Sequence, residues 1–80
     1  RANNMMSISG VLVHSKPENA VAIGAQLDQL SGVEVHAVEK GKLVVVVEKE
    51  NDRAIADAVT EMQHIDGVLN VAMVYHQNEA

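Results

Sequence analysis

The sequence predicts an α+β domain in which two helices cover one face of a four-stranded antiparallel sheet. Three observations lead to this fold class. Residues 43–47 are consecutive apolar residues, mostly β-branched, a run too short for a buried helix and typical of a strand. Two helical stripes of apolar residues occur in the chain. The second stripe has the same spacing as the first and lies 35 positions further along. Extended apolar segments flank both stripes.

The first half of the chain is predicted to be a strand, a helix and a strand. Residues 7–14 form the first strand, in which Gly10 indicates a bulge or a close approach of another backbone. A capping box of Ser15 and Glu18 is expected to begin the helix. The apolar stripe of this helix consists of Ala20, Ile23, Leu27 and Leu30. Residues 33–38 then alternate between apolar and polar, as a strand with one covered face does.

The second half repeats this pattern. A turn at residues 40–41 leads into the strand at 43–47, and Asn51 or Asp52 is expected to cap the second helix. The stripe of that helix consists of Ile55, Ala58, Met62 and Ile65. Residues 68–76 predict the last strand. Two β-α-β halves joined head to tail give the β-α-β-β-α-β order of a ferredoxin-like fold, and right-handed crossovers place both helices on one face.

Length and composition predict one small domain that binds a partner. The chain has 80 residues, no cysteine, a single aromatic residue and a net charge of −5, which argue against thiolate chemistry and against nucleic acid as a partner. No apolar run approaches the length of a membrane span, so we expect a soluble protein without membrane insertion. We expect a flexible segment over residues 1–6, whose first four residues are an expression remnant before Met5 or Met6, a domain over 7–77 and a loose tail over 78–80.

Both faces of the strand at 43–47 are apolar, so one apolar face is expected to remain without helices. A regular hairpin at 40–41, extended through the 35-residue repeat, predicts which residues lie on that face. They are Leu12, Val38, Leu43, Val45, Val47, Leu69, Val71, Met73 and Tyr75. The same extension places Asn70 on the covered face, which leaves the phase of the last strand open. An exposed apolar patch of this kind marks a binding or dimerisation surface.

The sequence shows no pattern for catalysis. The four histidines lack the i, i+3 or i, i+4 spacing of metal ligands, and the serines lack a nearby base and carboxylate. No strand is followed by a glycine-rich phosphate loop. We therefore expect a binding protein that is not an enzyme and holds no metal or cofactor.

Two strand segments have a distinctive sequence: Gly41-Lys42-Leu43-Val44-Val45-Val46-Val47-Glu48, and residues 67–77, whose last five are Met73-Val74-Tyr75-His76-Gln77. Both resemble the corresponding strands of NapD-type chaperones. The resemblance covers most of residues 8–77, including both helix lengths. It implies a cytoplasmic chaperone that binds the twin-arginine signal peptide of the NapA-type catalytic subunit of periplasmic nitrate reductase. Binding would hold back export through the Tat pathway until the molybdenum cofactor is inserted.

The apolar face and the acidic charge fit such a peptide, which carries two arginines followed by an apolar segment. A carboxylate at the edge of the face would suit the guanidinium fork, and the candidates are Glu34, Glu48 and Glu50. We expect a monomer with weak self-association. The alternative is a ligand-binding or dimerising regulatory module of the ACT or Lrp effector type, which usually comes fused to an enzyme or a DNA-binding domain.

Overall fold

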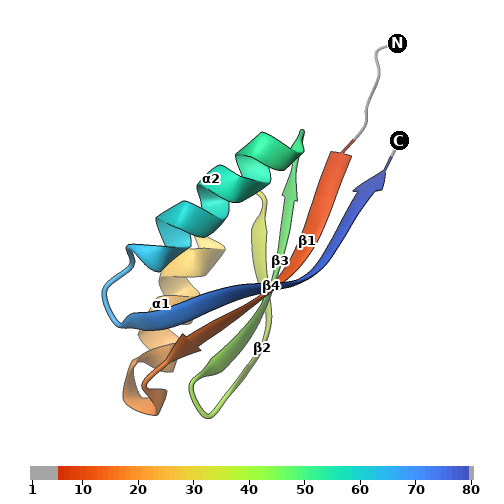
Figure 1. Cartoon of the computed structure of the whole chain (residues 1–80). Coiled ribbons are helices and arrows are strands. Elements are labelled where there is room, and N and C mark those ends of the chain that lie inside the picture. Colours follow the sequence, from red (N-terminus) through yellow and green to blue (C-terminus); the bar gives the residue numbers. More distant parts are fainter. Residues whose placement is uncertain (1–5, 80) are drawn as a thin grey trace.

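A four-stranded antiparallel sheet with strand order β2-β3-β1-β4 forms one layer of the computed structural model, which describes residues 6–79 (Figure 1). The strands are β1 Met6–Ser15, β2 Val33–Glu39, β3 Lys42–Lys49 and β4 Val68–Glu79. The second layer consists of a short 3-10 turn at Pro17–Asn19 and the helices α1 Ala20–Asp28 and α2 Asp52–Gln63. Both helices lie on the same face of the sheet (Figure 1). The predicted ferredoxin-like fold is therefore confirmed.

The two helices begin differently. Asn51 caps α2 as predicted, because its side-chain Oδ1 accepts a hydrogen bond of 2.8 Å from the backbone N–H of Ala54. The predicted start of α1 at Ser15 is wrong. Ser15 is the last residue of β1, where its backbone N–H donates to the carbonyl of Gly41 at 2.8 Å, and α1 begins only after the 3-10 turn.

The core lies between the helices and one face of the sheet. Leu43, Val45 and Val47 of β3 are 0% exposed. The rest of the buried apolar cluster consists of Val11, Val13, Ala20, Ile23, Leu27, Val33, Ile55, Ala58 and Met62. The predicted placement of Leu43, Val45 and Val47 on the face without helices is therefore wrong.

A bulge in β2 explains this inversion. Val35 pairs with Val45, but the next pair is Ala37 with Val44, so His36 is an extra residue on β2. A regular hairpin from the 40–41 turn would instead have paired His36 with Val45. The extra residue moves Val33 and Val35 onto the face of Leu43, Val45 and Val47. Val38 pairs with Leu43 at the covered edge, beside Gly24 of α1, so its predicted place on the other face is also wrong.

Two further bulges set the phase of β4. Val11 pairs with Met73 and Gly10 with Tyr75, which makes Val74 an extra residue beside Gly10. Val71 and Met73 therefore lie on the covered side, contrary to prediction, whereas Tyr75 lies on the face without helices as predicted. The glycine in β1 does mark a bulge, as expected.

The second irregularity lies near the start of β4. His14 pairs with Asn70 and Ser15 with Val68, which leaves Leu69 as an extra, exposed residue. Asn70 pairs with His14 and is exposed, so its amide is not buried beneath the helices. At the other end β4 continues to Glu79, so residues 78–79 are strand rather than a loose tail. Met6 likewise begins β1, while residues 1–5 and 80, predicted to be flexible, lie outside the described residues.

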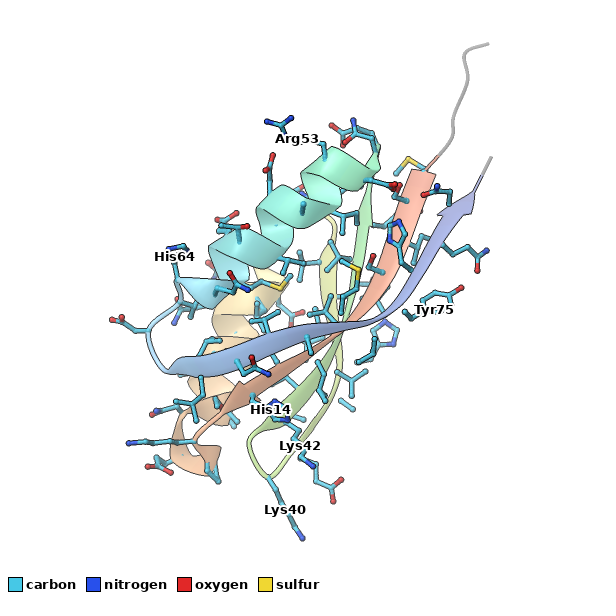
Figure 2. The ribbon with its side chains drawn as sticks, in the orientation of Figure 1. His14, Lys40, Lys42, Arg53, His64 and Tyr75 are labelled. Carbon is cyan, nitrogen blue, oxygen red and sulfur yellow. The ribbon has the colours of Figure 1, made fainter. Side chains whose placement is uncertain are left out.

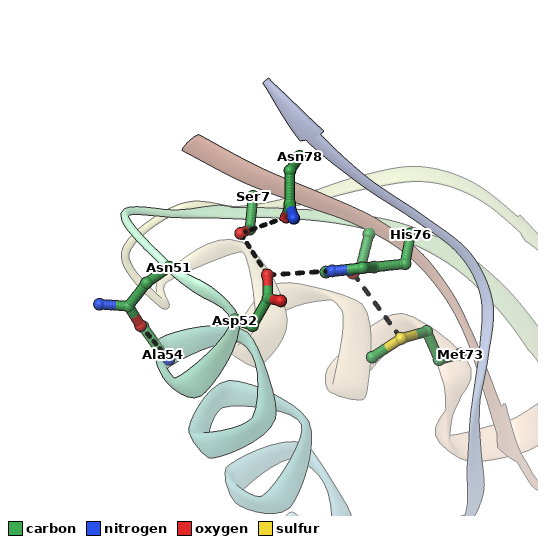
Figure 3. A network of polar contacts seen from close by, with 8 residues as sticks. Ser7, Asn51, Asp52, Ala54, Met73, His76 and Asn78 are labelled. Carbon is green, nitrogen blue, oxygen red and sulfur yellow. Dashed lines mark hydrogen bonds and ion pairs between the residues drawn. The ribbon is translucent and has the colours of Figure 1, made fainter. Parts of the chain in front are cut away.

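A polar network ties the start of α2 to β1 and β4 (Figure 3). The hydroxyl of Ser7 donates to Asp52 Oδ1 at 2.5 Å, and Nε2 of His76 lies 3.0 Å from the same oxygen. Nδ1 of His76 is 2.6 Å from the Ser9 hydroxyl. The pKa of the Asp52 carboxyl is lowered from its usual 3.8, chiefly by the hydrogen bond from Ser7. Partial desolvation raises this pKa, and the hydrogen bond and the charge of His76 lower it further.

The face assignment is tested by two neighbouring substitutions. Val45→Glu places an unpaired carboxylate in the core and should lower the free energy of unfolding by about 3 kcal/mol or more. Val44→Glu, on the opposite face, should change it by about 0.5 kcal/mol, as surface substitutions do, because Val44 is exposed. Urea titration followed by circular dichroism measures both. A folded Val45→Glu variant together with an unfolded Val44→Glu variant would invert the assignment.

Asp52 should contribute stability that depends on pH. Because its folded pKa is lowered, the contribution is complete above the unfolded value of 3.8 and is lost as pH falls through the folded pKa. We expect Asp52→Asn to lower the melting temperature at pH 6, and the difference from the original chain should shrink below pH 3.8. Asp57→Asn, on the exposed side of α2, controls for loss of a carboxylate. A difference that stays constant down to pH 2 would contradict this assignment.

Candidate functional site

The face of the sheet without helices, called the open face, is the candidate site. Its composition follows from the pairing of β1 with its two neighbours. The apolar residues on it are Ile8, Gly10, Leu12, Ala37, Val44, Val46, Ala72, Val74 and Tyr75. Val44, Val74 and Tyr75 are 44%, 65% and 52% exposed. Leu12 and Tyr75 are therefore correctly predicted to lie on this face, whereas Val44 and Val46 were missed because the strand phase was inverted.

Two carboxylates meet at one corner of the open face. Glu34 of β2 pairs with Val46, and Glu48 follows two residues after Val46 on β3, so both side chains belong to this face. They line a pocket of about 300 Å³ together with Met6, Gly32, Val33 and Val46. The corner thus combines two of the three candidate glutamates with apolar walls at the edge of the open face.

Gly32 allows this corner to close. Its carbonyl accepts a hydrogen bond of 2.8 Å from the N–H of Glu48, which brings the start of β2 against the end of β3. Gly32 has a φ of 75°, and a Cβ on it would lie 2.3 Å from the carbonyl oxygen of Glu48. Only glycine fits here, because both the conformation and the contact exclude a side chain.

The third predicted glutamate lies elsewhere. Glu50 lines a separate pocket of about 390 Å³ at the start of α2, with Ser7, Asn51, Asp52, Arg53 and Asn78. Glu34 has a neighbour of its own, since Nε2 of the bulge residue His36 lies 3.2 Å from its Oε1. Both side chains of that pair are largely exposed, so a ligand can reach the carboxylate.

The opposite end of the open face is cationic, which the sequence analysis missed. His14 of β1 pairs with Lys42 of β3, and Lys40 lies in the adjoining turn (Figure 2). Glu39 pairs with Lys42 from β2. Within residues 6–79, neither Lys40 nor Lys42 forms an ion pair. The two lysines around the turn could have indicated a cationic end of the sheet. The inverted phase predicted for β3, however, placed Lys42 on the covered face.

The Ser9–His76–Asp52 arrangement has the order of contacts of a catalytic triad, although these residues are far apart in the sequence. A nucleophile must contact its substrate, and Ser9 is 0% exposed beneath the helices. The group therefore serves the fold. Among the described residues, no three His, Asp or Glu side chains are placed to hold a metal ion, and no helix is long and apolar enough to cross a membrane.

Comparison with known proteins places the whole domain in one family. The family model described as "NapD protein" matches residues 6–80. Chaperone NapD of Escherichia coli K12 is 34% identical over 90% of this chain and 85% of its own length. Chaperone NapD of Haemophilus influenzae is 28% identical over 90% of this chain and 80% of its own length.

A solved structure agrees with these sequence matches. The solution structure of the E. coli Tat proofreading chaperone protein NapD is similar with a TM-score of 0.84 and 33% identity, over 92% of this chain and 80% of that one. The relatives are named as chaperones, which confirms the prediction of a binding protein that is not an enzyme. The matches extend over the sheet and both helices, and the chain belongs to the NapD family of chaperones.

Proposed function

We propose that this chain binds the twin-arginine signal peptide of a NapA-type nitrate reductase precursor on the open face and delays export until the molybdenum cofactor is inserted. The observation that carries this proposal is an exposed apolar sheet face that ends at a corner with two carboxylates. Membership of the NapD family supports it, as does the similar E. coli structure, which is titled a Tat proofreading chaperone.

The apolar segment of the peptide would supply most of the affinity. Folded as a helix, it would lay its apolar side on Leu12, Val44 and Val46, with Val74 and Tyr75 beside it. Each 100 Å² of apolar surface removed from water contributes about 2.5 kcal/mol before the cost of ordering the peptide. A contact of a few hundred Å² would therefore contribute several kcal/mol, against which the cost of association and ordering is set.

The arginines would be recognised at the corner pocket. A guanidinium presents parallel N–H donors that match a carboxylate, whereas a lysine ammonium is a point charge without this geometry. Glu34 and Glu48 line one pocket, so two neighbouring arginines could each find a carboxylate there. Exposed ion pairs contribute about 0–1 kcal/mol each, so this corner would add selectivity more than affinity.

Binding alone would delay export, because a signal covered by the open face is not available to the export machinery. In this proposal the chaperone acts in the cytoplasm, before translocation. We propose that the free chain is a monomer with weak self-association through the same face. A second copy would then compete with the peptide, since both would cover Val44 and Val46.

The apolar surface is tested with a pair of valine substitutions. Val44→Glu should weaken binding of a twin-arginine peptide at least about tenfold, because it places a charge under the apolar segment, outside the carboxylate corner. Val21→Glu is the matched control, since Val21 is 80% exposed on α1. Isothermal titration calorimetry measures both affinities. Equal loss in the two variants, or none in Val44→Glu, would place the peptide elsewhere.

The carboxylate corner is tested by peptide selectivity. The original chain should bind a twin-arginine peptide about threefold or more tightly than a twin-lysine peptide. The double variant Glu34→Gln with Glu48→Gln should lose most of this preference. Glu50→Gln, which changes the same charge outside the corner, should keep it. If Glu50→Gln abolished the preference and the double variant retained it, the arginines would be read at the start of α2.

A further inference from the structure

Charge is separated along the strands of the open face. Glu34 and Glu48 occupy one end, and His14 and Lys42 face each other across β1 and β3 at the other. Figure 2 shows His14, Lys42 and Lys40 gathered at the lower end of the sheet, with Tyr75 well away from them. The cationic end includes one carboxylate, Glu39, beside Lys42. Counting Lys40 of the turn, positive charge is in excess there.

The separation matches the length of a short helix. On β1, Ile8 is opposite Glu48 and His14 is opposite Lys42, so the two charged ends are six positions apart along the strand. At about 3.3 Å per residue this distance is about 20 Å. A helix rises about 1.5 Å per residue, so about 13 helical residues cover it. The apolar side chains of the open face lie between the two ends.

A helix lying on this face has its own polarity. Its N-terminus carries a partial positive charge, and its C-terminus carries a partial negative charge and carbonyls without helical partners. With the N-terminus at Glu34 and Glu48, the arginines and the positive helix end both meet carboxylates. The last carbonyls then lie over Lys42 and His14, which can donate hydrogen bonds. The reverse direction would place arginines beside lysines and helix carbonyls beside carboxylates.

We infer that the open face fixes the direction of the bound helix, with its N-terminal end at Glu34 and Glu48 and its C-terminal turn over His14 and Lys42. The inference rests on the proposed function and deepens it. Glu34 and Glu48 would select the arginine pair, and the cationic end would select a helix of matching length whose C-terminal turn carries no positive charge. Lys42 thereby acts as a second specificity-determining residue, about 20 Å from the arginine corner.

Paramagnetic labelling tests the direction. A nitroxide is attached to either end of a twin-arginine peptide, and amide signals of the isotope-labelled full chain are recorded. The N-terminal label should broaden Glu34 and Glu48, and the C-terminal label should broaden His14 and Lys42. The reverse pattern, or equal broadening of both ends by each label, overturns the inference while leaving the proposed function intact. Absence of peptide binding, or broadening confined to the helices, overturns both.

A charge reversal tests Lys42 separately. Lys42→Glu should lower affinity for the twin-arginine peptide about three- to tenfold in dilute buffer, and added salt should reduce the difference. Arg53→Glu makes the same change on α2, away from the open face, and should have little effect (Figure 2). If the peptide helix were bound in the opposite direction, the carboxylate of Lys42→Glu would lie beside the arginines of the peptide. A gain in affinity for Lys42→Glu therefore overturns the inference. No change relative to Arg53→Glu overturns it as well.

Discussion

Burial of three alternate side chains of β3 beneath the helices determines the rest of this structure. Leu43, Val45 and Val47 are fully buried, and because side chains alternate along a strand, Val44 and Val46 must point away from the helices. A chain of this size has only one helical layer, so the second apolar face of β3 has no cover within the described residues. The exposed surface is thus a direct consequence of how the core is made.

Much of the fold could be predicted from the sequence, because helices reveal themselves locally. The stripe through Ile55, Ala58 and Met62 is buried as expected, and the Asn51 cap is in place. The phase of a strand cannot be predicted in the same way, because one extra residue moves every later side chain to the other face of the sheet. The bulges at His36, Leu69 and Val74 have no clear sequence signature in β2 or β4, apart from Gly10 across from the last of them.

The candidate site was predictable to a similar extent. Tyr75 was placed correctly because the bulge at Val74 reverses the phase of β4 after Met73. Leu12 was placed correctly because two errors cancelled: β3 was given the inverted phase, and Leu12 of β1 was put on the same face as Leu43, whereas Leu12 pairs with Val44. The corner of Glu34 and Glu48 depends on Gly32, whose close approach to β3 appears only when the two strands are paired. The contact of His76 with Asp52 joins β4 to the first turn of α2, and no short-range pattern could have revealed it. Non-local pairings therefore account for most of what the sequence analysis missed.

The distribution of the bulges has a consequence for solubility. The central pairing of β1 with β3 is regular, whereas all three bulges lie on β2 and β4, which are the two edges of the sheet. An edge strand with a regular row of free N–H and carbonyl groups is a template for pairing with another chain, and a bulge interrupts that row. A protein that keeps an apolar face open is especially exposed to aggregation. Irregular edges would let it present that face without growing into an extended sheet.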